Sequence, residues 1–295
     1  MKYKFRAHDT FFIRKGWMNK GLKNVSKDPS AFMGTNGNPM DTLGIGSNMV
    51  KALRYWMQAV GLTYETQSGK REQFLTEFGQ LVYANDPYTE EFGTLWLLHY
   101  HLAKNISDAT AWYFFFNEFK NSEFDRDDFV IRLQAFLRME GEEVAVRSLE
   151  DDFNCIIGTY LPRIKSNPKK VNPESNIDCP LGDLGLIDIS NRNKKPWIYK
   201  RVIPKVDEIH PIIALAVIID QADGKKEIKI SSIQSDKCNL GKVFNLDVIS
   251  LTSILYSIEL MGYIKVIRTA GLDVIRIETD MSFLECVEAY YNLLK

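Results

Sequence analysis

The residues best suited to chemistry lie near the N-terminus, where His8, Asp9 and Arg14 fall within seven residues. A histidine can accept a proton, a carboxylate can orient that histidine or bind a metal ion, and an arginine can stabilise developing negative charge. This combination suits cleavage of a phosphodiester bond, so we predict these three residues as catalytic candidates. Neighbouring side chains in an extended strand point to opposite sides, so a joint site requires a turn between His8 and Arg14. The alternative is that His8 and Asp9 only brace the first helix.

A second set of candidates lies in the C-terminal half, where Asp220 precedes Glu227, Ile228 and Lys229. The order imitates the Asp…Glu-x-Lys arrangement of many nucleases, in which two carboxylates hold a divalent metal and the lysine polarises water. The spacing is short and Asp220 falls at the end of an expected helix, so this arrangement is the less favoured one. The metal ligands stay unknown, and a divalent ion such as magnesium is the cofactor that this chemistry would use.

Positive charge is concentrated in the first 71 residues, which carry twelve lysines and arginines against four acidic residues. This segment has a net charge of +8, whereas the whole chain has a net charge of −1. Clustered cations of this kind bind polyanions, and we predict double-stranded DNA as their ligand. The predicted DNA-binding residues are Lys15, Lys20, Asn48, Lys51, Arg54, Tyr55, Lys70 and Arg71, with Lys265 and Arg268 near the C-terminus.

A helix followed by a hairpin should present the N-terminal candidates. Apolar residues recur at helical spacing over 47–60, and a short hairpin with a basic tip is expected over 62–75. The apolar stripe should face the core and leave Lys51, Arg54 and Tyr55 on the solvent side. Helix and then hairpin is the order of a winged helix-turn-helix, a common DNA-binding unit.

The same order of elements recurs near the C-terminus. A helix is expected over 247–261 and a hairpin over 263–277. The exposed face of this helix carries serine and threonine, and cations appear only on the hairpin, at Lys265 and Arg268. Winged helices also bind proteins, and a neutral face suits a protein partner better than DNA.

A run of helices is expected between the two units, over 94–160. The prolines and polar residues of 165–183 are typical of a linker between domains. We therefore predict a mainly α fold with small β-hairpin wings, an α+β protein with two winged helix-turn-helix-like units joined by a helical middle. The predicted domains are 1–164, basic and DNA-binding, and 184–295, the C-terminal winged-helix-like unit.

The composition excludes several other classes of protein. No apolar run is long enough to cross a bilayer, and the N-terminus lacks the apolar core of a signal peptide. The four cysteines show no metal-ligand spacing, which favours reduced thiols and a cytoplasmic location. The sequence also lacks a Walker loop and the glycine pattern of dinucleotide-binding proteins.

Several stretches taken together resemble a known family. They are 8–17, 43–50, 54–56, 76–79, 86–88, 94–99 and 268–273. Their order and spacing resemble the SspB-type family of the bacterial Ssp DNA phosphorothioation and phage-defence system, over nearly the whole chain. The first motif of that family usually has Glu after its histidine, and here Asp9 supplies a carboxylate one methylene shorter.

This resemblance implies an enzyme that nicks one DNA strand so that sulfur can enter the backbone. The partners that it implies are a cysteine desulfurase, an ATPase and an ATP-pyrophosphatase-like protein. The alternative is a non-catalytic DNA-binding adaptor or regulator, which would recruit partner enzymes through its C-terminal unit. Self-association as a homodimer is left open by the sequence.

Overall fold

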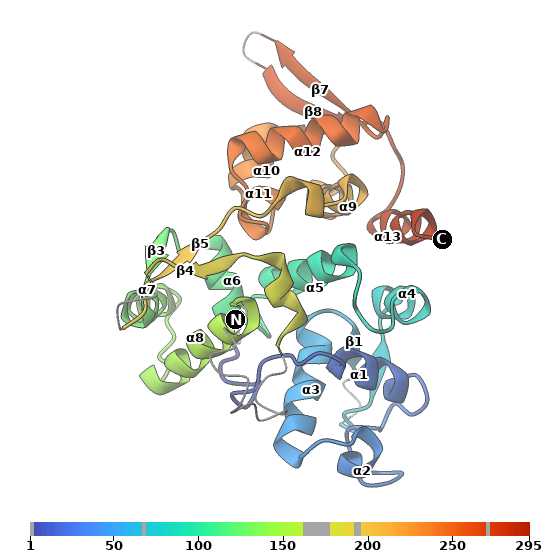
Figure 1. The fold of residues 1–295 in the computed structure, drawn as a ribbon, viewed down its shortest axis with the longest axis vertical. Helices are drawn as coiled ribbons and strands as arrows, with labels where there is room; N and C mark the ends of the chain where they lie inside the picture. The colour runs from blue at the N-terminus through green and yellow to red at the C-terminus, as the bar shows by residue number, and fades with distance from the viewer. Residues whose placement is uncertain (1–2, 67–68, 162–177, 192–195, 270–271) are drawn as a thin grey trace.

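The computed structural model describes residues 3–66, 69–161, 178–191, 196–269 and 272–295. Helices dominate this part of the chain and are joined by small antiparallel sheets (Figure 1), so the expected α+β class is confirmed. The helices of the first 160 residues are α1 (Trp17–Val25), α2 (Pro39–Leu43), α3 (Ser47–Ala59), α4 (Glu77–Asn85), α5 (Phe92–Lys104), α6 (Thr110–Asn117), α7 (Arg126–Met139) and α8 (Val146–Tyr160).

Helix α3 buries the apolar stripe that its sequence predicts. Leu53, Trp56 and Met57 are all fully enclosed, and the Trp56 indole N–H donates to the Phe11 carbonyl at 2.8 Å. Helix α1 crosses α3 closely at Gly21, where an added Cβ would lie 2.3 Å from the Met57 sulfur. The N-terminal segment and the first three helices are thus fixed by the packing around α3.

The strands form three small sheets. The first is the hairpin of β1 (Thr63–Glu65) and β2 (Gln73–Leu75), as the sequence predicts. The second contains β3 (Glu123–Phe124), β4 (Ile187–Ile189) and β5 (Tyr199–Arg201) in the order β3-β5-β4. The third contains β6 (Glu227–Lys229), β7 (Ile264–Thr269) and β8 (Leu272–Ile277) in the order β6-β8-β7. The second sheet was not expected, since its strands are very short and pair across a long stretch of sequence.

The C-terminal part is also mainly helical. Its helices are η3 (Pro180–Leu184), η4 (Val206–Glu208), α9 (Pro211–Ala222), α10 (Ile230–Ser235), α11 (Leu240–Val243), α12 (Val248–Leu260) and α13 (Phe283–Leu293). Helix α9 is apolar on nearly every side because α5, α12 and α13 all pack against it. Helices α10, α11 and η3 are short and were not expected from the sequence.

The buried side chains form one continuous core from Ile13 to Tyr291. At its centre His99 joins the two halves: its Nδ1 lies 2.7 Å from the Tyr160 hydroxyl, and its Nε2 lies 2.7 Å from the Val243 carbonyl oxygen. This continuity differs from the separate cores that a linker over 165–183 would imply. Residues 162–177 of that segment lie outside the described residues, so the domain boundaries stay a prediction.

The order of helices and hairpins agrees with the sequence patterns in both halves. The N-terminal unit has the order α3, β1, β2, α4, with a sheet of two strands. The C-terminal unit has the order α9, β6, α10, α11, α12, β7, β8, with a sheet of three strands. The winged helix-turn-helix interpretation of these units is not confirmed by element order alone and stays a prediction. Within the described residues, no single helix is long and apolar enough to span a membrane.

Candidate nucleic-acid interface

The N-terminal segment before α1 contains a turn, which a shared site of His8, Asp9 and Arg14 would require. Arg6, Asp9 and Thr10 have positive φ angles of 56°, 49° and 66°. Such angles are uncommon for side chains with a Cβ, so the segment is held by its surroundings. The turn directs His8 into the core, where its ring lies nearly parallel to the Trp56 ring at 5.9 Å.

His8 is held at both ring nitrogens. Its Nδ1 accepts a hydrogen bond from the Thr10 backbone N–H at 3.1 Å, so its Nε2 carries the proton and donates to Asp152 Oδ1 at 2.7 Å. The Arg6 backbone N–H donates to the same oxygen at 2.8 Å. Burial raises the pKa of Asp152, although the hydrogen bonds from His8 and Arg6 favour its charged form. In this arrangement His8 has no free nitrogen to accept a proton, and its contacts are those of a brace.

The other two catalytic candidates are not brought to His8. Among the described residues, no hydrogen bond or ion pair joins the side chains of His8, Asp9 and Arg14 to one another. The Arg14 guanidinium lies 5.6 Å from the ring centres of both Phe11 and Trp17, where cation–π attraction holds it. The predicted catalytic role of these residues therefore stays a prediction, without a joint site in this conformation.

The solvent face of α3 is narrower than the sequence predicts. Asn48 and Lys51 are exposed, as expected. Tyr55 is not, since it lies in the core and its hydroxyl donates to the Asp108 carbonyl at 2.9 Å. This corrects the prediction of an exposed Tyr55, because the N-terminal segment at His8 and the loop at Asp108 cover more of α3 than its apolar stripe. Arg54 is half-buried and forms an ion pair of 2.5 Å with Glu65.

The remaining N-terminal candidates divide into free and engaged cations. Lys70 and Arg71 are exposed at the tip of the β1–β2 hairpin and, like Lys51, form no ion pair with any described residue. Lys15 is exposed but lies 3.5 Å from a Glu90 carboxylate oxygen. The Lys20 ammonium donates to the Leu43 carbonyl at 2.8 Å and so caps the end of α2.

The two C-terminal candidates are both paired with acids. Lys265 lies 3.6 Å from Glu259, and Arg268 lies 3.1 Å from Asp273. Arg268 also donates to the Thr252 hydroxyl at 3.3 Å. Their positive charge is thus compensated locally, unlike that of Lys51, Lys70 and Arg71.

The described residues show no group of three or more His, Cys, Asp or Glu side chains that could hold a metal ion. Asp220 and Glu227 are each engaged elsewhere: Asp220 accepts from Lys104 at 2.7 Å and from the Tyr100 hydroxyl, and Glu227 pairs with Arg276 at 2.9 Å. These two carboxylates therefore do not form the predicted Asp…Glu-x-Lys site. The described side chains do not fit a metal held by the protein alone.

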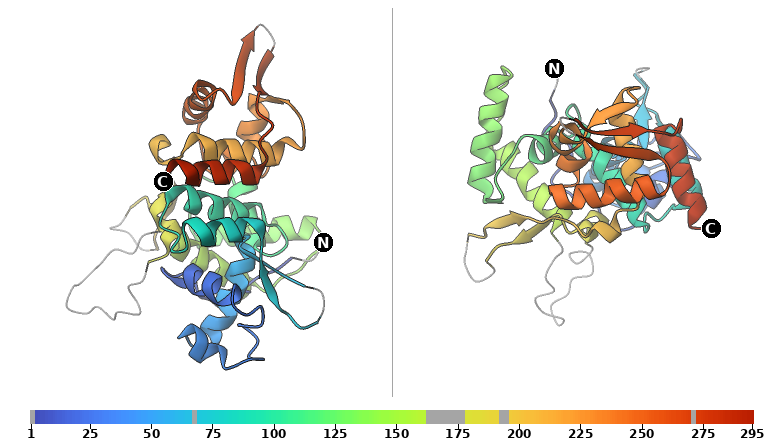
Figure 2. Two further views of the ribbon diagram at one scale, coloured as in Figure 1. Left: turned by 90° about the vertical axis from the view of Figure 1, so that its right-hand side faces the viewer. Right: turned by 90° about the horizontal axis from the view of Figure 1, so that it is seen from above.

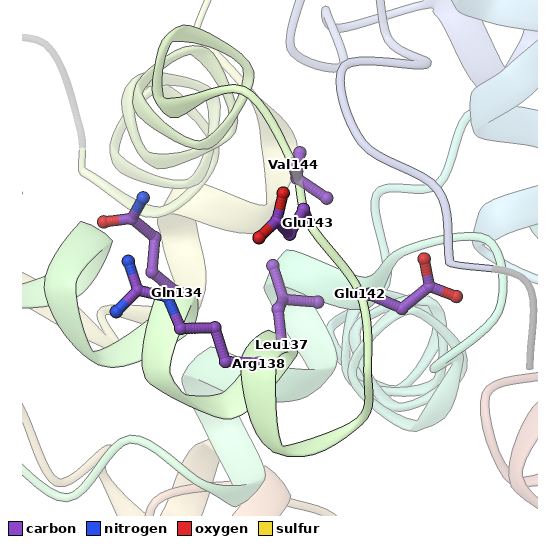
Figure 3. Close-up of a pocket in the computed structure, with 6 residues that line it drawn as sticks. All are labelled: Gln134, Leu137, Arg138, Glu142, Glu143 and Val144. Carbon is purple, nitrogen blue, oxygen red and sulfur yellow. The ribbon is translucent and has the colours of Figure 1, made fainter.

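Two hollows lie away from these residues. One of about 230 Å³ lies at the end of α7 (Figure 3), and there Glu142 is directed away from Arg138, so the polar groups do not converge. Another, of about 780 Å³, lies between α5, α9, α12 and α13 and is lined by Ile209, Ile254, Tyr290 and others. Neither hollow contains a predicted catalytic or DNA-binding residue.

Asp152 is the residue that the sequence reasoning missed. It is one of the most deeply buried carboxylates among the described residues, with 1% of its surface exposed. A signal for this was present, because Leu149, Asp152, Phe153 and Ile156 share one helical stripe. A carboxylate on an apolar stripe needs a buried partner, and His8 is that partner.

Two crystal structures share the fold of this protein. A magnesium ion-bound SspB superposes with a TM-score of 0.84 at 22% identity, covering 98% of this chain and 88% of that one. A second SspB crystal structure gives a TM-score of 0.81 at 22% identity, covering 99% and 86%. The resemblance to SspB-type proteins stated from the motifs is thus confirmed at the level of the fold. A search of curated proteins finds none that matches.

The family follows from the sequence itself. Residues 5–291 match the model of DUF4007, a family described as proteins of unknown function. Because the match extends over nearly the whole chain, the protein belongs to the DUF4007 family.

Proposed function

We propose that this protein binds duplex DNA through Asn48, Lys51, Lys70 and Arg71, here called the basic face. The observation that carries the proposal is that three exposed cations of this face have no counter-charge among the described residues, whereas the cations on the C-terminal hairpin are paired. Free cations gain most from phosphate contact, because no existing ion pair must be broken.

The hairpin supports this surface by its position beside α3. The Leu62 backbone N–H donates to the Met57 carbonyl at 3.0 Å, at the end of α3. From there β1 runs back along the helix, so that Glu65 meets Gln58 at 2.9 Å and Arg54 at 2.5 Å. The hairpin tip therefore extends toward the first half of α3, the half that carries Lys51. A helix with a basic hairpin beside it suits a groove and its flanking phosphates.

For the biological role, we propose a DNA-binding component of a DNA phosphorothioate modification and phage-defence system that nicks one strand. The shared fold with SspB and the motif resemblance support this role. The magnesium reported for one SspB structure is compatible with a magnesium-dependent reaction. The expected partners remain a cysteine desulfurase, an ATPase and an ATP-pyrophosphatase-like protein.

A second function, the non-catalytic adaptor, is favoured by one specific observation. Both nitrogens of His8 are engaged, so the N-terminal segment offers no free base in this conformation. A plasmid-relaxation assay with magnesium and with EDTA separates the two functions. Nicking by the parent that is lost in His8→Ala and Arg14→Ala, with folding confirmed by circular dichroism, supports the enzyme. A parent that binds DNA but leaves supercoiled plasmid intact supports the adaptor.

The basic face is tested by the salt dependence of DNA binding. Lys51→Ala combined with Lys70→Ala should weaken binding to all sequences and lower the log–log salt slope by about two, since each phosphate contact contributes about 0.9. Fluorescence anisotropy with a labelled duplex measures both quantities. The matched control is Lys205→Ala with Lys226→Ala, which removes two exposed cations that are paired with acids. Equal slopes for the parent and the basic-face variant would place the DNA surface elsewhere.

A further inference from the structure

The exposed face of α12 is mostly apolar, which differs from the face with serine and threonine that the sequence predicts. Ile249 is 79% exposed and Leu260 is 89% exposed, and Val248, Tyr256 and Met261 are also open to solvent. Figure 2 shows α12 at the outside of the C-terminal part, with its outer side away from the neighbouring helices. A cluster of large apolar side chains on one open helix face marks a protein interaction site.

The spacing of this face is that of a helix–helix seam. Ile249, Ser253, Tyr256 and Leu260 are all exposed and are separated by four, three and four residues. This alternation keeps side chains on the line along which two helices pack. The opposite stripe, with Leu251, Ile254, Leu255 and Ile258, is already buried against the protein.

The seam is complementary to itself when two copies run antiparallel. A two-fold axis between Ser253 and Tyr256 would place Ile249 against Leu260 of the other copy, and Ser253 against Tyr256. The small serine then makes room for the tyrosine ring, while the two large aliphatic side chains meet at the ends. Isologous contacts of this kind are what a two-fold symmetric dimer needs.

Charge and area both favour a second copy as the occupant. The only ionisable carboxylate or cation within α12 is Glu259, and it is engaged by the Val266 backbone N–H at 2.8 Å and by Lys265. The hairpin adds one cation beside the seam, since the Arg268 guanidinium lies 5.9 Å from the Tyr256 ring centre, but Asp273 compensates its charge at 3.1 Å. Two copies of α12 would therefore meet without uncompensated charge. Ile249, Tyr256 and Leu260 line the seam, and Val248 and Met261 flank it on either side, so a dimer that covered all five side chains would bury at most about 1,200 Å², the lower limit of stable interfaces.

We propose that this protein forms a two-fold homodimer in which α12 packs antiparallel on α12 of a second copy. The dimer goes beyond the proposed DNA binding, and it presents two basic faces in one particle. The proposed dimer depends on α12 alone, whereas the proposed DNA binding depends on the N-terminal half. An experiment can therefore refute one of these two proposals and leave the other intact.

The first test is the oligomeric state of the full chain by sedimentation equilibrium across micromolar concentrations. The parent should be dimeric, and Leu260→Glu should weaken the dimer at least about 100-fold, because a carboxylate would be buried against an apolar surface. The substitution leaves folding intact because Leu260 is almost fully exposed. Ile131→Glu is the matched control, since Ile131 is an exposed apolar residue on α7. A monomeric parent, or an equal effect of both variants, would overturn the proposal.

The second test is the register of the helix pair by disulfide trapping in a Cys238→Ser background, which removes the only partly exposed cysteine among the described residues. Ile249→Cys with Leu260→Cys should give a covalent dimer under mild oxidation. The two positions are eleven residues apart on one helix, about 16 Å, so they cannot pair within a chain. Either single variant should stay uncrosslinked. Crosslinking by the single variants, or none by the double variant, would contradict the antiparallel register.

Discussion

The burial of His99 should make the stability of this protein depend on pH in mildly acidic solution. His99 is 0% exposed at the centre of α5, where its Nε2–H donates to the Val243 carbonyl and its Nδ1 accepts from the Tyr160 hydroxyl. Burial lowers the pKa of His99 from 6.5 to about 4, because the charged ring would lose its hydration, although the Val243 carbonyl partly offsets this.

The sign and size of the effect follow from these two pKa values. As the pH falls below 6.5, the unfolded chain takes up a proton at His99, whereas the folded chain does so only near pH 4. Protonation therefore favours unfolding in this window. The free energy of unfolding should fall by about 2 kcal/mol between pH 7 and pH 5 through His99 alone, and by about 3 kcal/mol once the pH is well below 4.

Urea titrations followed by tryptophan fluorescence at pH 7, 6 and 5 measure this dependence. His99→Gln can still donate to the Val243 carbonyl but takes up no proton. It should be less stable than the parent at pH 7 and lose about 2 kcal/mol less on going to pH 5. Tyr160→Phe is the control, since it removes the same hydroxyl contact and keeps the histidine. Tyr160→Phe should therefore lose stability with pH as steeply as the parent, and the reasoning is refuted if His99→Gln does so too.

Two further predictions concern packing and the buried carboxylate, and both are measured by urea unfolding at pH 7. Gly79→Ala should destabilise the fold by about 2 kcal/mol or more, because its Cβ would lie 2.0 Å from the Leu62 carbonyl oxygen, which is rigid backbone; an unchanged midpoint would contradict this packing. Asp152→Ala should cost about 3 kcal/mol, since it leaves His8 Nε2–H and the Arg6 N–H without an acceptor. Asp152→Asn retains an acceptor oxygen and should lose less; equal losses for the two variants would argue against the hydrogen bonds.

Local patterns in the sequence were enough to predict most of the helices and the two hairpins. The predicted helix over 47–60 became α3, and the helix over 247–261 became α12, with ends displaced by at most one residue. The hairpins over 62–75 and 263–277 also lie where turn and alternation patterns placed them. Strands repeat every two residues and helices every three to four, so residues close together in the sequence are enough to indicate either element.

Exposure was predicted less well than helicity. Lys51 and Lys70 are exposed as expected, because long charged side chains rarely leave water. Tyr55 was misplaced because its neighbours include Asp108, fifty-three positions further along the chain in the loop between α5 and α6, and His8, forty-seven positions before it. A helical wheel shows where an apolar stripe lies, but it does not show how wide a face the rest of the protein will cover.

The sequence by itself therefore determined the α+β class, the positions of the main helices, and the concentration of positive charge in the first 71 residues. Only the tertiary structure decided that His8 is bound by Asp152 across 144 residues, and that β3 and β5 pair across more than seventy. The reason is physical: a contact between distant residues depends on how whole elements pack. Its favourable energy must offset the entropy lost when the long loop between the two residues is closed, and a local sequence pattern carries no information on that balance. The same packing leaves one apolar face of α12 exposed to solvent. The sequence pattern predicted the helix but did not predict that this face would stay uncovered.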